Sequence, residues 1–273
     1  MGDYSTIVRL GEGVDKNRSL GEAPRKRTLD CLKTYAEHVE KAGLDPKDTV
    51  AVATSSVRDS NNGAEFFAQI AKETGFQFRL LSGDDEAKYT FLGGLLPGMN
   101  PEKCAVIDIG GGSTEFMSIT GGQSIDMGSV RFTERFLKSD PATSAEFEAC
   151  VQATNHLLEP LVQGWRKRVA PGTELVAVAG TATTLAAWQA RLPHFDAAKI
   201  DQLSLSVKDL YAMATELGKL SVSERARLPG MEAKRADVIL AGAIILWRSV
   251  EVLGFSSCRI SSRGLRYGIL GIH

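Results

Sequence analysis

One stretch constrains the fold of this chain more than any other. Residues 104–120 read CAVIDIGGGSTEFMSIT, and two further glycines follow. A β-branched apolar run, then glycines, then an alternating run predict a strand, a tight turn and a second strand. The other elements are therefore expected to assemble around this glycine hairpin.

The turn of the hairpin has the composition of a phosphate site. Glycines permit positive φ and close approach of a ligand, so several N–H groups can point into one concavity that suits an anion. Mg²⁺ usually binds through one or two carboxylates plus phosphate oxygens. We therefore expect Asp108 and Glu115, at the two ends of the turn, to hold Mg²⁺ or another divalent cation. An ordinary flexible hairpin turn is the alternative. The residues expected on phosphate are Gly110, Gly111, Gly112, Ser113 and Thr114.

The overall charge excludes some partners. The chain has 273 residues, of which 43% are hydrophobic and 24% charged, and a net charge of −1. This length favours two domains, and the balance of charge provides no general field for nucleic acid or an anionic membrane. We expect neither partner, and a polyanionic substrate would need a local basic cleft.

The cysteines and apolar runs indicate the compartment. The four cysteines are widely spaced, and Cys104 and Cys258 stand in apolar runs. Such residues are typical of buried free thiols, so we expect a protein of the reducing cytoplasm. The longest apolar run, residues 236–254, is interrupted by Arg248 and Glu251, and we expect it to be a core helix.

Strands and helices are expected to alternate along the chain. This order predicts an α/β protein with mixed sheets flanked by helices and ligands at the carboxyl ends of strands. The polar segment 97–103 predicts a boundary between domains 1–100 and 101–273, with the last helix packing back on the first domain. Residues 6–10 are expected to form a strand, and Pro160 to kink or divide a long helix.

A second loop of glycine and hydroxyl residues follows a buried strand at residues 174–179. Helix N-termini favour phosphate oxygens, although a plain N-cap is an equal alternative. We expect this loop and the glycine hairpin to grip phosphates from opposite sides of a hinge. The residues of the second loop are Gly180, Thr181, Ala182 and Thr183.

Acids and arginines elsewhere complete the expected site. Glu86, with Asp85 behind it, is the group expected to orient or deprotonate a water molecule, although acids at a helix start also complement its dipole. Arg58, among small polar residues, suits a phosphate chain, and a surface salt bridge is the alternative. Arg266 either lines the cleft or starts a helix. The pair Lys234 and Arg235 is interpreted as a solvated helix face.

Several segments together resemble the exopolyphosphatase and guanosine pentaphosphate phosphohydrolase (Ppx/GppA) family of the actin-like phosphotransferase superfamily. They occur in the order of that family and span nearly all of the chain. The segments are ATSSVRDSNNG (53–63), LSGDDEA (81–87), VIDIGGGSTEF (106–116), GTATT (180–184) and RGLRYG (263–268).

The resemblance implies two ribonuclease-H-like domains with a cleft between them. It implies Mg²⁺-dependent hydrolysis of the terminal phosphoanhydride of inorganic polyphosphate, or of the 5′ γ-phosphate of guanosine pentaphosphate. By the same resemblance Glu86 activates water, Asp108 and Glu115 lie near the metal, and Arg58 contacts phosphate. The loop from Gly180 corresponds to the nucleotide loop of actin-like proteins, and a homodimer is a family expectation.

One feature departs from the family pattern. Family members begin with another strand–Gly/Ser/Asn–strand hairpin, whereas residues 6–13 here resemble the family segment that comes after that hairpin. The first domain is therefore expected to be shortened. Two rival functions stay open beside the hydrolase. They are an actin-superfamily small-molecule kinase and a polyphosphate- or alarmone-binding protein with impaired catalysis.

Overall fold

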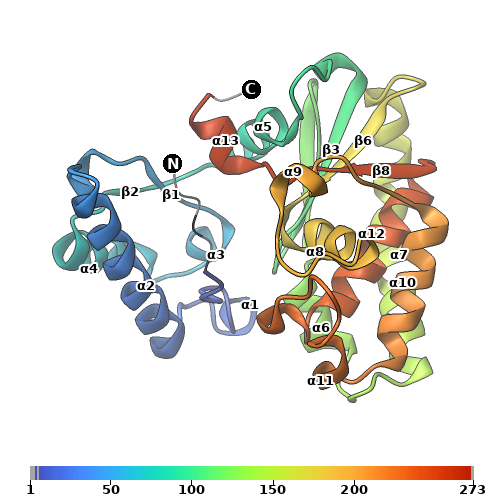
Figure 1. The fold of residues 1–273 in the computed structure, drawn as a ribbon, viewed down its shortest axis with the longest axis horizontal. Coiled ribbons are helices and arrows are strands. Elements are labelled where there is room, and N and C mark those ends of the chain that lie inside the picture. Colours follow the sequence, from blue (N-terminus) through green and yellow to red (C-terminus); the bar gives the residue numbers. More distant parts are fainter. Residues whose placement is uncertain (1–3, 5, 272–273) are drawn as a thin grey trace. The chain divides into compact units, whose positions relative to one another are not determined.

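The chain folds into two compact units, each with its own apolar core. They are Met1–Gly83 and Asp84–His273, and the computed structural model describes Tyr4 and residues 6–271 (Figure 1). Both units combine helices with strands, so the expected α/β class with a mixed sheet flanked by helices is confirmed.

The first unit is built from two helices packed beside a small parallel sheet. The sheet pairs Ala51 with Phe78 and Ala53 with Leu80. Phe66 and Ile70 lie on the helix of residues 63–74 and are buried against the helix of residues 22–41. Its elements are α1 (Val14–Asn17), α2 (Glu22–Lys41), a 3₁₀ turn (Pro46–Asp48), β1 (Ala51–Ala53), α3 (Ser55–Arg58), α4 (Gly63–Thr74) and β2 (Phe78–Leu80).

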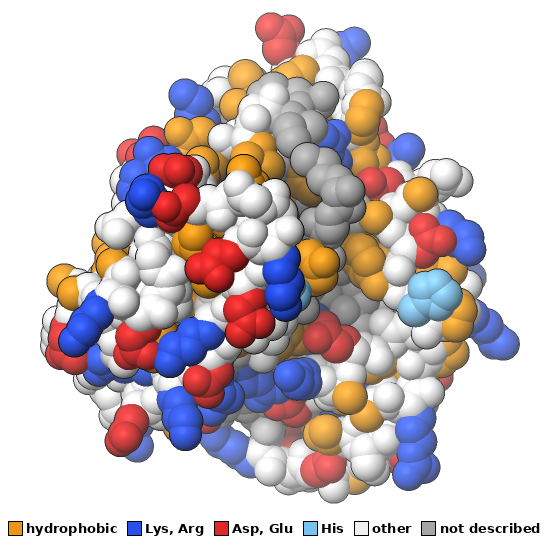
Figure 2. All heavy atoms as spheres, turned by 60° about the vertical axis from the view of Figure 1, so that its left-hand side comes forward, with side chains coloured by type: hydrophobic (Ala, Val, Ile, Leu, Met, Phe, Trp, Pro, Cys, Tyr) orange, Lys and Arg blue, Asp and Glu red, His pale blue; other side chains and the backbone are white. Residues whose placement is uncertain are grey.

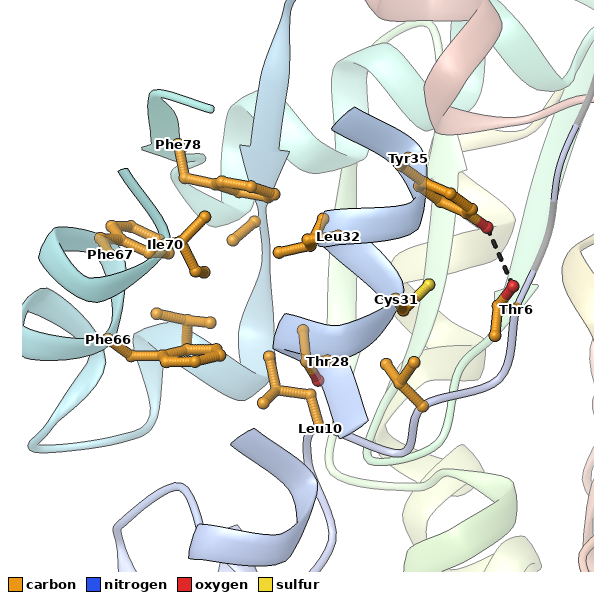
Figure 3. A pocket seen from close by; sticks show the side chains of 13 residues that line it. Thr6, Leu10, Thr28, Cys31, Leu32, Tyr35, Phe66, Phe67, Ile70 and Phe78 are labelled. Carbon is orange, nitrogen blue, oxygen red and sulfur yellow. Dashed lines mark hydrogen bonds between the residues drawn. The ribbon is translucent and has the colours of Figure 1, made fainter. Parts of the chain in front are cut away.

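An apolar cavity of about 200 Å³ lies inside the first unit (Figure 3). Side chains from α2, α4 and the sheet line it, together with Thr6, Val8 and Leu10. The predicted strand at residues 6–10 is wrong, because this segment is irregular and pairs with no strand of the described chain. Its alternating side chains instead face the cavity, and Tyr35 Oη donates to Thr6 Oγ1 at 3.1 Å at the rim.

Positive and negative side chains are interspersed on the face of the molecule drawn in Figure 2. Among the described residues of the first unit, several basic side chains form ion pairs with acids that are distant in the sequence. The pairs are Arg25–Glu65 at 2.8 Å, Arg27–Glu12 at 2.5 Å and Lys33–Glu73 at 2.7 Å. This mixture agrees with the small net charge of the chain.

The second unit is organised around one mixed sheet in the strand order β5-β4-β3-β6-β8-β7. β3, β6 and β8 are parallel, and β4, β5 and β7 pair antiparallel to their neighbours. The strands are β3 (Cys104–Ile109), β4 (Thr114–Ser118), β5 (Gly121–Ile125), β6 (Glu174–Val178), β7 (Ser204–Ser206) and β8 (Ser257–Ile260).

The remaining elements of this unit are helical and cover both faces of the sheet. They are α5 (Gly83–Gly94), α6 (Ser129–Phe136), α7 (Ser144–Arg168), α8 (Ala179–Gln189), α9 (Ala197–Ile200), α10 (Val207–Lys219), α11 (Val222–Arg225), α12 (Ile239–Val252), α13 (Leu265–Ile269) and two 3₁₀ turns (Pro101–Lys103 and Ala233–Arg235).

The alternation along β3 assigns the helices to the two faces. Ala105, Ile107 and Ile109 point into the larger core, with α7, α8, α10 and α12. Cys104 and Val106 point the other way, against Phe91 of α5 and Leu95, which directly follows that helix. Because successive side chains of a strand face opposite sides, one strand serves both cores.

α5 and α13 lie side by side on this second face (Figure 1) and approach unusually closely. A Cβ on Gly93 would clash with the backbone of Gly268, and one on Gly268 with the carbonyl of Tyr89. The last helix thus packs on α5. We expected a boundary at residues 97–103, but the compact units divide at Gly83, because α5 buries its apolar side chains on the second sheet.

α7 continues through Pro160, so this residue does not divide the helix.

The cysteines are not paired with one another. Cys104, Cys150 and Cys258 are buried and Cys31 is half-buried, and all four are free, so the expectation of free thiols is confirmed. In the described part of the chain, no helix has both the length and the apolar character needed to cross a membrane.

Candidate active site

Two carboxylates face each other where β3 and β4 meet the glycine turn. Asp108 and Glu115 are direct partners in the antiparallel register, and Ile109 and Thr114 close the ladder before the turn. Side chains of directly opposed residues project from the same face of a sheet with Cβ atoms about 5 Å apart. The local sequence therefore dictates this carboxylate pair.

Two hydroxyl groups fix Glu115. Its Oε1 accepts a hydrogen bond from Ser113 Oγ at 2.5 Å and another from Ser124 Oγ, on β5, at 2.8 Å. Thr114 is different, because it is fully buried and its hydroxyl donates to the carbonyl of Met127. That hydroxyl holds the hairpin together and is not available to a ligand.

Asp108 titrates abnormally. Burial raises the pKa of its carboxyl to about 8, and the negative charges of Glu115 and Glu86 add to the effect. Without a cation, Asp108 is thus largely protonated at neutral pH. The influence of Glu86 also brings α5 into the site, because Glu86 lies at the start of that helix and is half-buried.

The backbone of the turn is arranged so that its N–H groups stay available. The Gly110 N–H donates to the Ser113 carbonyl at 2.9 Å, which closes the turn. The carbonyls of Gly110 and Gly111 accept from the backbone of residues 129–131. Among the hydrogen bonds of the described chain, none uses the N–H of Gly111, Gly112 or Ser113, so three adjacent donors remain for an anion.

A second segment, missed by the sequence analysis, supports this turn. Gly128 lies so close to Gly111 and Gly112 that a Cβ on it would clash with their backbone. α6 begins at the next residue, and its Arg131 places Nη2 3.6 Å from the position that a Cβ on Gly112 would occupy. In the sequence this segment is marked by nothing more than a glycine before a short helical stretch.

The second loop lies beside the first rather than opposite it. β6 is the parallel neighbour of β3, and Asp108 is paired with Val178. The carboxyl ends of both strands therefore lie at the same end of the sheet. The expectation that the two loops face each other across a hinge is wrong for this reason. In α/β sheets, ligands bind at the carboxyl ends of the strands, next to the point where the strand order reverses.

The residues of the second loop are inside helix α8. Thr181, Ala182 and Thr183 are buried, and Thr183 Oγ1 donates to the Ala179 carbonyl at 3.1 Å. Ala179 adopts a left-handed conformation, with φ of 65°, as the chain passes from β6 into the helix. The loop therefore offers backbone N–H groups of the first helical turn rather than hydroxyls.

Arg235 covers Gly180, contrary to its interpretation as part of a solvated helix face. A Cβ on Gly180 would clash with the Arg235 guanidinium, which is half-buried. Arg235 Nε also donates to Glu232 Oε2 at 3.0 Å. A glycine is needed here because the guanidinium lies directly on the backbone.

Three residues expected in the site are more peripheral within their own units. Asp85 is exposed on α5, next to Glu86. Arg266 is exposed on α13, whose neighbour Arg263 donates to the Leu95 carbonyl at 3.3 Å. Arg58 belongs to the first unit, where it ends α3 and its Nη1 donates to the Leu81 carbonyl at 3.4 Å.

The carboxylate pair fits a divalent cation. Within the residues that the structure describes, no three His, Cys, Asp or Glu side chains are grouped to enclose a metal. Mg²⁺ does not need such a cage, because it keeps several waters and commonly takes one or two carboxylates with substrate phosphate oxygens. The pKa of Asp108 is raised by burial and by the neighbouring acids, so its ionised form is costly without a cation, which is the condition that a metal would relieve.

Comparison with known sequences identifies the family of the chain. The chain matches the Ppx/GppA phosphatase family over residues 1–271. It is 34% identical to exopolyphosphatase 2 of Mycobacterium tuberculosis over 255 residues, which cover 88% of this chain and 77% of that protein. It is 33% identical over 259 residues to the bifunctional 3-dehydroquinate synthase/phosphatase of Fusobacterium nucleatum, covering 91% of this chain but only 38% of that protein.

Solved structures give the same result. The crystal structure of an exopolyphosphatase-like protein superposes with a TM-score of 0.84 at 27% identity, covering 97% of this chain and 88% of that one. The sequence match, the fold and the carboxylate-flanked glycine turn agree with one another. The chain belongs to the Ppx/GppA phosphatase family.

Proposed function

We propose that this protein is a metal-assisted phosphoanhydride hydrolase that releases the terminal phosphate of inorganic polyphosphate. The observation that carries the proposal is the facing pair Asp108 and Glu115 at a turn with three available N–H donors. The name of the Mycobacterium tuberculosis relative supports polyphosphate as the substrate.

Each group has a proposed role in the reaction. The N–H groups of Gly111, Gly112 and Ser113 bind oxygens of the terminal phosphate, and Glu86 orients a water molecule and accepts its proton. When bound at Asp108 and Glu115, a divalent cation neutralises the charge of the phosphate chain. Phosphoryl transfer needs such positioning and charge neutralisation more than covalent chemistry.

The neighbouring first turn of α8 extends the cradle along the phosphate chain. Its N–H groups lie at the same end of the sheet as the glycine turn, because β3 and β6 are parallel and paired. Arg235, which lies against Gly180, adds positive charge there. These features suit several linked phosphates. They serve polyphosphate and guanosine pentaphosphate equally, so the experiment includes both.

Release of orthophosphate tests the proposal. We expect multiple turnovers on polyphosphate in the presence of Mg²⁺ and none in EDTA, with guanosine pentaphosphate measured in parallel under the same conditions. Stoichiometric ATP binding without phosphate release from polyphosphate would instead identify a kinase. Retained polyphosphate binding without release in Mg²⁺ would identify a binding protein, and either result would overturn the proposal.

A further inference from the structure

Arg131 is held against the glycine turn from two directions. Its backbone N–H donates to the Gly111 carbonyl at 3.0 Å, and its guanidinium lies beside Gly112. The preceding Gly128 has no room for a side chain because its backbone touches the turn. The start of α6 thus packs directly against the turn, and this packing fixes the position of the guanidinium beside the turn.

The side chain of Arg131 is largely removed from solvent. Only 12% of it is exposed, whereas Asp126, whose carboxylate lies 3.5 Å from Nη1, is 80% exposed. A long ion pair with an exposed acid contributes little free energy. Asp126 therefore does little to hold the guanidinium in place, because the acid itself remains mostly in water.

The charge around the turn explains why a guanidinium is needed there. Asp108, Glu115 and Glu86 bring acidic groups close together, and a phosphate chain adds several more negative charges. A bound divalent cation offsets part of this repulsion. A planar guanidinium offers parallel N–H donors in the spacing of two phosphate oxygens, and it keeps its charge at every physiological pH.

We propose that Arg131 is a substrate-positioning residue whose guanidinium binds the phosphate held at the glycine turn. This inference rests on the proposed hydrolysis of a phosphate chain. It assigns a positively charged residue that determines specificity to the second unit itself. The competing explanation is structural, in which Arg131 only fastens α6 to the hairpin. The two explanations differ in whether substrate affinity changes apart from stability.

Steady-state kinetics of three variants separates these explanations. R131Q removes the charge of the side chain, and R131K keeps the charge without the forked guanidinium. K208Q is the control, because it removes one charge from an exposed position on α10, beside the outermost strand β7. We expect R131Q to raise KM for polyphosphate by roughly 10- to 100-fold, with a smaller change in kcat and a Tm close to that of the parent protein. R131K should recover part of the loss, and K208Q should match the parent.

Binding measured without turnover keeps the two proposals distinguishable. Calorimetry with polyphosphate in EDTA should give a weaker Kd for R131Q than for the parent protein, even if the parent releases no phosphate in Mg²⁺. Equal KM and equal Kd for R131Q and the parent would overturn the role of Arg131. So would losses that follow the Tm of each variant, with no advantage of lysine over glutamine.

Discussion

Asp108 and Glu115 face each other but are held by different means. Two hydroxyl donors fix Glu115 as an acceptor, whereas Asp108 has a pKa raised to about 8 by burial and by nearby acids. A cation that binds between them must therefore displace the proton of Asp108. Cation affinity is expected to increase as the pH approaches 8.

The titration of Asp108 predicts how stability depends on pH. Because its pKa is raised in the folded state, the proton on Asp108 contributes stability that is fully present below the usual pKa near 4 and is lost as the pH rises to about 8. In EDTA, D108N should therefore gain in Tm relative to the parent protein between pH 5 and pH 9.

Thermal unfolding of both proteins across this pH range checks the prediction. Added Mg²⁺ should stabilise the parent at pH 8 and leave D108N unchanged, because the carboxylate is missing. A difference in Tm between the two proteins that stays constant from pH 5 to pH 9 would contradict the assignment.

The hydroxyl of Ser124 is expected to act through Glu115. Its removal in S124A leaves that carboxylate with one fewer donor, and loss of such a supporting contact commonly costs roughly 10- to 100-fold in metal affinity. The apparent Mg²⁺ affinity in the phosphate-release assay measures this effect. S223A, which removes an exposed hydroxyl on α11, is the control, and equal Mg²⁺ dependence of the two variants would refute the role.

Among the elements, α5 matters most because it carries Glu86 and packs without space on α13. In G93A the new methyl group would meet the backbone of Gly268, and such overpacking typically costs about 1–3 kcal/mol. We expect a lower Tm and a lower kcat, since Glu86 moves with its helix.

G164A provides the matched control for G93A. Gly164 lies within α7 with open space around it, so alanine should stabilise that helix by about 0.5–1 kcal/mol. Chemical denaturation of both variants measures the free energies of unfolding. A G93A protein as stable as the parent would show that the two helices separate easily.

Local patterns predicted the elements but not their partners. The alternating run before Thr120 identified β4, and the buried runs identified β3 and β6. The three-residue β7 was missed, because its pairing with β8 decides it. The long helix α7 was predicted, but its continuity through Pro160 was not, because packing on α12 decides it. The role of the Gly128–Arg131 segment was hidden for the same reason, since only the folded hairpin brings it to the glycine turn.

At the scale of the whole chain, the pairing of β3 with β6 changes how the site is built. The sequence identified both glycine loops but assigned them to opposite sides of a hinge. In the structure both belong to Asp84–His273, which also contains Glu86 and a large core of its own. Strand order within a sheet is a long-range property that spacing along the chain does not encode.

This arrangement predicts that the second unit folds by itself. A fragment of residues 82–273 should unfold cooperatively and bind Mn²⁺ through Asp108 and Glu115. Thermal unfolding with and without Mn²⁺ measures both properties, and D108N in the same fragment is the control. A fragment with no cooperative transition would show that this unit depends on the first.

The most direct test of the central claim compares two neighbouring acids on α5. E86Q removes the carboxylate expected to accept a proton from water, whereas D85N changes an exposed acid one residue away. Orthophosphate release from polyphosphate in saturating Mg²⁺ is the measurement, with polyphosphate binding measured beside it. The account predicts that E86Q binds polyphosphate normally but loses about 10²- to 10⁴-fold in kcat, and that D85N loses far less. Equal phosphate release by E86Q and the parent protein would contradict it.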